Sequence, residues 1–182
     1  GGPGSAGTVK DVQFQSLLEL FKYSGFVRGY RNVMGTGTLS FAGRLDGNSY
    51  NKLMGNPLNQ PTLSVSASLP TAVSGLFFNA NMGQFTQLPS YTILGYRNAQ
   101  GGFENQDRIK YMRNRMVAAG LQYNKVKDTK ITWEGFYKNY SNYPFALRDS
   151  ICLGNLGTDF AVLGNEPVSS VSRGKAYGME FL

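Results

Sequence analysis

The sequence contains no histidine and only one cysteine, Cys152. The lack of histidine excludes a Ser-His-Asp triad, a Cys-His pair and a His-ligated zinc site. A single cysteine excludes an internal disulfide framework and a thiolate metal site. Cys152 lies in the apolar segment 150–153, which is more typical of a plain small apolar residue than of a nucleophile. We therefore expect no catalytic activity, no metal site and no cofactor.

The chain also lacks a run of about 18 apolar residues, which excludes a transmembrane helix. This absence does not exclude a membrane barrel, because barrel strands alternate in polarity and leave no hydropathy peak. Residues 1–7 have neither the charged start nor the apolar segment of a signal peptide, and are interpreted as a linker or a cloning remnant. No repeat or second domain is visible in residues 8–182.

The composition favours β structure. The chain has 182 residues, with 23 Gly, 11 Tyr and 12 Phe, a combination that suits strands, tight turns and aromatic girdles. The net charge is +7, but the basic residues are spread along the chain. A basic balance of this kind is also compatible with a nucleic-acid binder, but the sequence has no recognised nucleic-acid motif, so we expect no nucleic-acid partner.

Alternation of apolar and polar residues predicts about seven strands. The clearest is 62–69, where Leu63 and Val65 alternate with Ser64 and Ser66. The expected strands are 12–21, 36–45, 62–69, 76–85, 115–123, 129–140 and 174–182. Short turns at 25–35, 70–75 and 124–128 alternate with long loops at 46–61, 86–114 and 141–173. This polarity is typical of an up-and-down outer-membrane barrel, with short turns at one end and long loops at the other.

Two all-β architectures fit this pattern. In a membrane barrel the apolar faces contact lipid and the polar faces line a wet lumen. In a soluble sandwich the apolar faces are buried against a second sheet. Bacterial barrels have an even number of strands, at least about eight. We therefore expect the fold class to be all-β, an antiparallel up-and-down transmembrane β-barrel, with residues 8–182 forming a segment of about seven strands of a larger barrel.

Several motifs in residues 36–182 resemble the barrel of TonB-dependent outer-membrane receptors. They are the segments 50–59, 84–91 and 95–98, then 134–144, 153–160 and 164–167, and last the Gly-Lys-Ala-Tyr-Gly-Met-Glu run at 174–180. The similarity is to the large Bacteroidetes-type transporters, the SusC/RagA-like group or the group with a carboxypeptidase-regulatory-like domain.

The resemblance implies a 22-stranded barrel with an N-terminal plug, located in the bacterial outer membrane. It implies import of an iron chelate, cobalamin or an oligosaccharide, driven by TonB. The expected partners are that small nutrient ligand, outer-membrane lipid, TonB through parts of the receptor that this sequence lacks, and a surface lipoprotein. The segment itself would supply pore wall and extracellular ligand loops. The alternative function is a soluble carbohydrate-binding or adhesin-like module.

Aromatic and amide side chains in the long loops suit stacking on and hydrogen bonding to a sugar or chelate. The alternative is that they pack the loops against one another. The ligand-loop candidates are Tyr91, Tyr96, Arg97, Asn98 and Phe103 in one loop, and Tyr140, Tyr143, Arg148 and Asp149 in the next.

Three further groups carry hypotheses. An interfacial girdle is predicted for the aromatics Tyr123, Trp133, Tyr137 and Tyr177, with ordinary packing as the alternative. Glu134 and Glu180 are interpreted as solvated lumen residues rather than an acid-base pair. The basic cluster Arg108, Lys110, Arg113 and Arg115 is interpreted as the solvated start of a strand, with binding of anionic lipopolysaccharide as the alternative.

Overall fold

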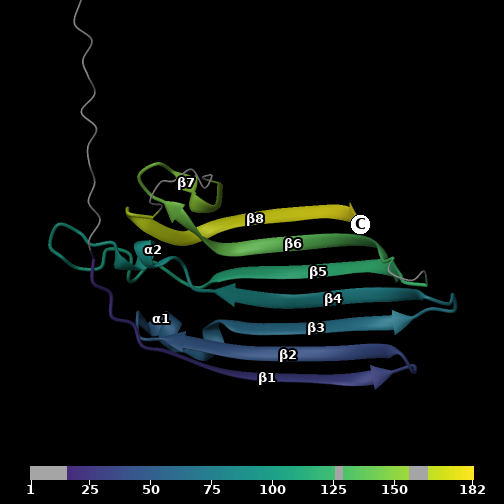
Figure 1. Ribbon diagram of the computed structural model, residues 1–182. Coiled ribbons are helices and arrows are strands. Elements are labelled where there is room, and N and C mark those ends of the chain that lie inside the picture. Colours follow the sequence, from purple (N-terminus) through teal and green to yellow (C-terminus); the bar gives the residue numbers. More distant parts are fainter. Residues whose placement is uncertain (1–15, 126–128, 156–163) are drawn as a thin grey trace, which may run out of the picture.

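The structure is a computed structural model that describes residues 16–125, 129–155 and 164–182. It is a single antiparallel sheet whose strands follow one another in chain order (Figure 1). The long strands are β1 (Lys22–Val33), β2 (Gly37–Asn48), β3 (Pro61–Pro70), β4 (Leu76–Gln87), β5 (Met112–Tyr123), β6 (Ile131–Ala146) and β8 (Val168–Phe181). The two-residue β7 (Ile151–Cys152) pairs with the end of β6. The all-β, antiparallel, up-and-down part of the prediction is confirmed.

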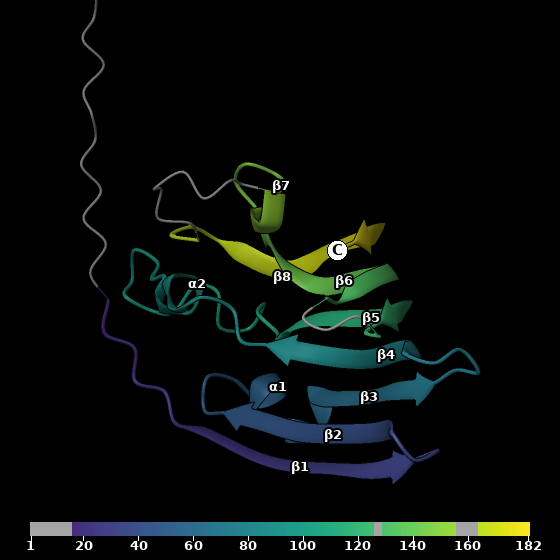
Figure 2. The same ribbon diagram turned by 45° about the vertical axis from the view of Figure 1, so that its right-hand side comes forward.

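The sheet is open. Within the described residues, β1 and β8 lie at opposite margins and do not pair with each other. Figures 1 and 2 show the strands as one curved layer, with the short helical segments confined to one end. Among the residues that the structure describes, no helix has the length and apolar character needed to cross a membrane.

Short and long connections alternate as predicted, and each kind gathers at one end of the sheet (Figure 1). The short ones are 34–36, 71–75 and 124–130, of which 126–128 lie outside the described residues. The long ones are 49–60, 88–111 and 147–167, of which 156–163 lie outside the described residues. The long connections carry α1 (Lys52–Gly55), η1 (Pro57–Asn59), α2 (Tyr91–Gly95) and η2 (Leu153–Asn155).

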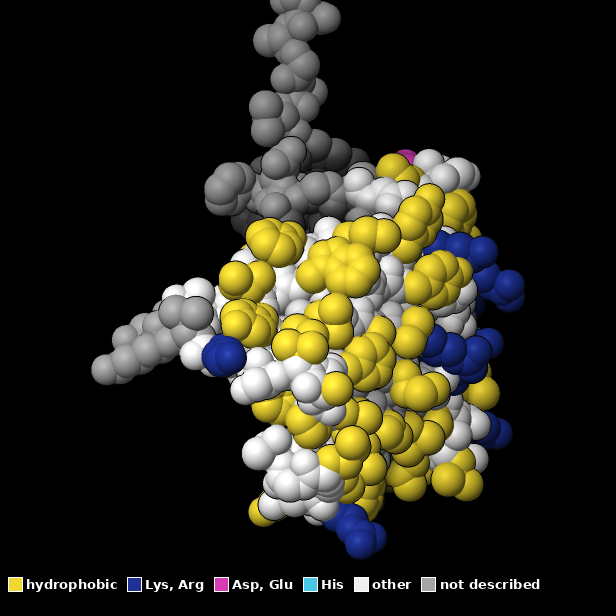
Figure 3. All heavy atoms as spheres, turned by 90° about the vertical axis from the view of Figure 1, so that its right-hand side faces the viewer, with side chains coloured by type: hydrophobic (Ala, Val, Ile, Leu, Met, Phe, Trp, Pro, Cys, Tyr) yellow, Lys and Arg dark blue, Asp and Glu magenta, His cyan; other side chains and the backbone are white. Residues whose placement is uncertain are grey.

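The strand register sorts the side chains onto two faces, because successive residues of a strand point to opposite sides. One face, here called the apolar face, carries aliphatic and aromatic residues on every long strand. It includes Val27, Phe41, Val65, Met82, Val117, Trp133, Tyr137, Tyr177 and Met179. Figure 3, seen from the short-turn end, shows hydrophobic side chains over much of the visible surface, with Lys and Arg side chains toward its right-hand edge.

The opposite face, here called the polar face, carries mainly hydroxyl, amide and charged side chains. It includes Ser40, Ser64, Ser66, Asn79, Asn81, Gln122, Glu134, Lys138 and Glu180, together with the aromatics Phe26, Tyr30 and Phe136. Glu134 and Glu180 are direct cross-strand partners on this face. The predicted alternation of Leu63 and Val65 with Ser64 and Ser66 is therefore confirmed by the register.

The first predicted strand and turn are wrong. The described part of the expected strand 12–21, residues 16–21, lies outside any strand, and most of the expected turn 25–35 belongs to β1. The glycine-rich sequence pairs well because Gly29 lies directly opposite Phe41. A Cβ at Gly29 would collide with the Phe41 ring, so the bare backbone provides the space for that ring. The turn itself is limited to residues 34–36.

Several predicted loops are too long. Strand β6 continues to Ala146 and β8 begins at Val168, so residues 141–146 and 168–173 of the expected loop 141–173 belong to strands. The register shifts between Tyr140 and Pro144, and Asn142 has a φ of 58°. This β-bulge breaks the alternation on which the prediction depended.

Candidate functional site at the long-loop end of the sheet

The hydrophobic core of the described residues lies in the long connections and not in the sheet. Apart from Ala118, all buried hydrophobic residues lie in these connections or where β6 and β8 meet them. The core cluster comprises Tyr50, Met54, Ile93, Leu94, Ile109, Tyr111, Ala146, Leu153 and Val168. The three long connections therefore pack together as one unit, here called the loop cap.

The first and second long connections are joined by reciprocal hydrogen bonds. The Tyr50 hydroxyl donates to the Leu94 carbonyl at 2.9 Å, and Gln106 Nε2 donates to the Tyr50 carbonyl at 2.6 Å. Asn51 Nδ2 donates to the carbonyls of Gln106 and Ile109 at 2.7 and 3.0 Å. Each acceptor is a backbone carbonyl of the other connection, so these bonds hold the two connections against each other.

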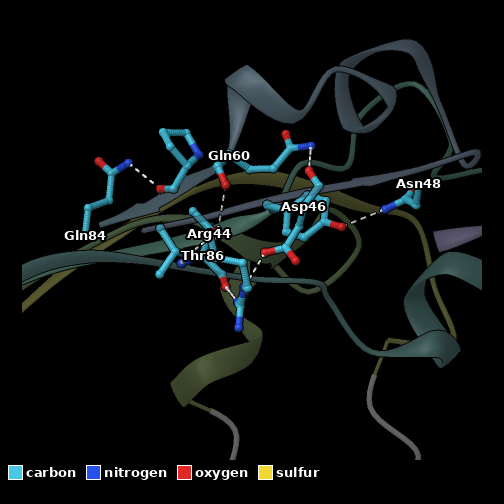
Figure 4. A network of polar contacts seen from close by, with 9 residues as sticks. Arg44, Asp46, Asn48, Gln60, Gln84 and Thr86 are labelled. Atoms are coloured by element: carbon cyan, nitrogen blue, oxygen red, sulfur yellow. Dashed lines mark hydrogen bonds and ion pairs between the residues drawn. The ribbon is translucent and has the colours of Figure 1, made fainter. Parts of the chain in front are cut away.

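A second network anchors the cap to the sheet (Figure 4). Gln60 Nε2 donates to the carbonyls of Asp46 and Met54 at 2.6 and 2.8 Å, and the Gln60 carbonyl accepts from Thr86 Oγ1 at 3.0 Å. Arg44 Nε pairs with Asp46 Oδ2 at 2.8 Å. These contacts tie the end of the first connection to β2 and β4, which holds the cap on the ends of the strands.

Burial changes the ionisation of two tyrosines in the cap. Tyr50 is 3% exposed, and its burial, followed by the nearby negative charge of Asp107, raises its pKa to about 12. Burial also raises the pKa of Tyr111, against a hydrogen bond from Asn48 that lowers it. Both phenols are therefore neutral hydrogen-bonding groups at neutral pH.

Three of the ligand-loop candidates in the second connection hold the loop itself. Arg97 donates to the carbonyls of Leu17 and Gly101, and its guanidinium lies 4.2 Å from the centre of the Phe103 ring. Asn98 Oδ1 accepts from the backbone N–H groups of residues 100 and 102. Phe103 also packs against Tyr50, with ring centres 6.3 Å apart. For these three residues, the geometry favours the packing alternative.

The other two candidates of this connection differ in exposure. Tyr91 is 56% exposed at the start of α2, and its hydroxyl accepts a hydrogen bond from Lys22 Nζ. Tyr96 is half-buried directly after α2, and its carbonyl accepts from the Glu104 N–H at 3.0 Å. Tyr91 therefore keeps an aromatic surface that a ligand can reach.

Tyr140 and Tyr143 lie in β6 and not in a loop, which corrects the prediction. Their rings pack edge to face with centres 5.4 Å apart. Arg148 and Asp149 do lie in the third connection, and Arg148 forms ion pairs with Asp149 and Glu166. The hydrogen bond to Asp149, followed by the negative charges of Asp149 and Glu166, raises the pKa of Arg148 above its usual value. The positive charge of Arg148 is therefore paired with these carboxylates.

The structure brings Tyr140 and Tyr143 together with residues that the sequence did not single out as ligand contacts. They line a pocket of about 410 Å³ whose other walls are Cys152, Gly154, Asn155, Arg173, Gly174 and Lys175. Two phenols, an amide and two cations suit a hydroxylated or anionic ligand. Of the missed residues, Arg173 comes from the end of the predicted loop 141–173, and Gly174 and Lys175 come from the predicted strand 174–182; all three lie in β8.

Within the described ranges, no group of three or more His, Cys, Asp or Glu side chains is arranged to hold a metal ion. Comparisons of the chain with protein-family models, with curated proteins and with solved structures gave no significant match.

Proposed function

We propose that residues 8–182 are a wall segment of a TonB-dependent receptor in the bacterial outer membrane, which binds and imports a small nutrient. The ligand classes are those of the sequence resemblance: an iron chelate, cobalamin or an oligosaccharide. The loop cap would supply ligand contacts through Tyr91 and the pocket of Tyr140 and Tyr143. The observation that carries the proposal is a one-layer sheet with an uncovered apolar face.

The exposed apolar area argues for lipid contact. Phe41, Val65, Met82 and Val117 are each at least 50% exposed, although they come from four neighbouring strands. Soluble monomers rarely expose a contiguous apolar patch larger than a few hundred Å². The Leu63–Leu69 part of β3 is roughly 20 Å long at ~3.4 Å per residue. This length is of the same order as the ~25 Å apolar band of outer-membrane barrels.

The open margins argue for further strands. In lipid, backbone groups at an unpaired strand edge have no hydrogen-bonding partner, and each costs several kcal/mol. Strands beyond β1 and β8 would satisfy both margins and close a barrel around the polar face. In this proposal the plug, the site of TonB action and any contact with a surface lipoprotein belong to other parts of the receptor.

The single tryptophan provides a direct test. Trp133 lies on the apolar face and is 46% exposed. The chain is folded into phosphatidylcholine vesicles whose acyl chains carry bromine, which quenches fluorescence on contact. We expect strong quenching of Trp133 by brominated lipid and weak quenching by acrylamide from water.

A composition-matched control uses the opposite face. The double variant Trp133→Phe/Phe136→Trp moves the indole to the polar face and leaves the amino-acid composition unchanged. Its fluorescence should respond to acrylamide and not to brominated lipid. If the original chain stays in solution without detergent, with Trp133 insensitive to brominated lipid, the soluble-module alternative replaces the proposal.

A further inference from the structure

A cluster of positive charge adjoins the apolar face toward its long-loop end. The last apolar row across β5, β6 and β8 is Val117, Tyr137 and Tyr177. The next row in register is Arg115, Asn139 and Lys175. Together with Arg113, Ser141, Asn142, Arg173 and Gly174, the members of this next row line one pocket of about 540 Å³. The four cations Arg113, Arg115, Arg173 and Lys175 are here called the basic site.

No carboxylate neutralises the basic site within the described residues. The ion pairs of the described residues involve three other cations, Arg44, Arg108 and Arg148. Two of the four cations are positioned by neutral acceptors: Arg113 Nη2 donates to the Asn59 carbonyl and Arg115 Nε to Gln84 Oε1, both at 2.9 Å. These bonds orient the guanidinium groups and leave their charge uncompensated.

The spacing concentrates this charge. Arg115 and Lys175 lie two strands apart, about 10 Å across the sheet. Arg113 and Arg115 lie on the same face of β5, about 7 Å apart along the strand. These separations are close to the Debye length of ~8 Å at physiological salt, so the four fields reinforce one another. An anion among them would interact with several cations at once.

We infer that the basic site binds the phosphate groups of an anionic membrane lipid headgroup, whose acyl chains lie against Val117, Tyr137 and Tyr177. The inference rests on the proposed function, because it requires the apolar face to be in lipid. Arginine forms forked hydrogen bonds with phosphate oxygens, and the side chains of Asn139 and Ser141 add polar partners. The headgroup is favoured over free phosphate because the cations directly follow an exposed apolar row on the same face.

The experiment measures which lipid gathers around the chain. Vesicles of phosphatidylcholine contain a minor fraction of phosphatidic acid, and bromine is placed on the acyl chains of one lipid or the other. Quenching of Trp133 by brominated phosphatidylcholine reports insertion, which tests the proposed function alone. Because Trp133 lies about 20 Å along β6 from Asn139, selection is measured in the background Trp133→Phe/Tyr137→Trp, whose indole lies in the apolar row beside the basic site. In this background, the ratio of quenching by brominated phosphatidic acid to quenching by brominated phosphatidylcholine reports selection of the phosphate-bearing lipid.

For a chain whose basic site is unaltered we expect phosphatidic acid to be enriched about fivefold or more, since each basic residue near a lipid surface contributes about fivefold. The variant Arg115→Gln/Lys175→Gln keeps Arg113 and Arg173, and it should reduce this enrichment about fivefold or more while keeping the quenching by brominated phosphatidylcholine. The control Arg31→Gln/Lys138→Gln removes the same charge. Arg31 lies near the short-turn end of the apolar face, and Lys138 lies on the polar face. This control should remain selective.

Two results would overturn the inference while leaving the proposed function intact. One is equal enrichment in the Arg115→Gln/Lys175→Gln variant and the unaltered chain, or an equal loss in the control. The other is absence of enrichment in the unaltered chain together with binding of inorganic phosphate that the Arg115→Gln/Lys175→Gln variant lacks, which would assign the basic site to free phosphate. Failure of brominated phosphatidylcholine to quench Trp133 would reject the proposed function, and with it the lipid assignment.

Discussion

The side chain of Asn105 accepts a hydrogen bond from the backbone N–H of Val168 at 2.8 Å, and both residues are fully buried. Asn105 lies in the second long connection, and Val168 is the first residue of β8. The Asn105 amide also donates to the carbonyls of Ile93 and Glu166 at 2.9 and 3.0 Å. One side chain thus determines where the third connection ends and β8 begins.

Replacing Asn105 should therefore loosen the loop cap. Asn105→Ala leaves one N–H and two carbonyls without their partner in a buried position, and we expect a loss of about 2–3 kcal/mol in the free energy of unfolding. Urea unfolding followed by tyrosine fluorescence measures this loss. The exposed Gln100→Ala, in the same connection, is the control and should change stability by less than ~0.5 kcal/mol. Equal effects of the two variants would contradict the role given to Asn105.

Two glycines allow steric and conformational costs to be separated. Gly164 has a φ of 87°, and a Cβ there would collide with the buried Ile93 side chain. Gly101 has a φ of 82°, but a Cβ would meet nothing within 4 Å. Gly101→Ala should cost about 1 kcal/mol of backbone strain, and Gly164→Ala about 2–4 kcal/mol because overpacking adds to that strain. Thermal unfolding of the two variants checks the difference, and similar losses would show that the third connection does not pack on Ile93 in solution.

Neighbouring residues of β3 test which face contacts lipid. Val65 and Ser66 are both exposed but lie on the apolar and polar faces respectively. Val65→Lys should reduce the free energy of insertion into vesicles by about 2–4 kcal/mol, the cost of a lysine near the bilayer centre. Ser66→Lys should leave insertion nearly unchanged, because its charge stays in water. Insertion is measured as the vesicle-bound fraction across a urea series, and an equal effect of the two lysines would argue against a lipid-facing apolar side.

Alkaline pH should weaken the loop cap through Tyr50. The pKa of this phenol is raised from 10.0 to about 12 in the folded chain, so the folded state retains the proton more strongly than the unfolded state. The resulting stability is complete below pH 10 and is lost as pH rises toward 12. Titration of tyrosinate absorbance should show a late component, to which the buried Tyr111 also contributes, and Tyr50→Phe should reduce this component by one tyrosine. A late component unchanged by this substitution would indicate that Tyr50 is open to water.

The strands could be predicted where one face carried only apolar residues and the other face only polar residues. The stretch 62–69 alternates without interruption. In the structure it pairs with β2 on one side and β4 on the other, and its apolar residues share one face as predicted. Prediction failed at Lys22–Val33, where glycines interrupt the apolar face and aromatic residues occupy the polar one. It also failed at the β6 bulge, where the period of two is broken. In both places the strand is stabilised by a neighbouring strand, and single-strand periodicity does not contain that information.

The candidate ligand residues show the same limit. Tyrosines, arginines and asparagines in long loops suit either ligand binding or loop packing, and the sequence does not distinguish between them. The structure directs Asn98 to backbone groups of its own connection and Arg97 to the carbonyls of Gly101 and Leu17, while Tyr140 and Tyr143 line a pocket with Arg173 and Lys175. That distinction depends on which segments the fold brings together.

The sequence alone excluded histidine-dependent chemistry and an internal disulfide, and it determined the β class and the alternation of short turns with long loops. These properties depend on residue identity and local periodicity. The tertiary structure decided that Arg115, Asn139 and Lys175 share one row, that the core lies in the loop cap, and that the apolar face is uncovered. These relationships depend on strand register and long-range contacts, which are set by the packing of segments far apart in the chain.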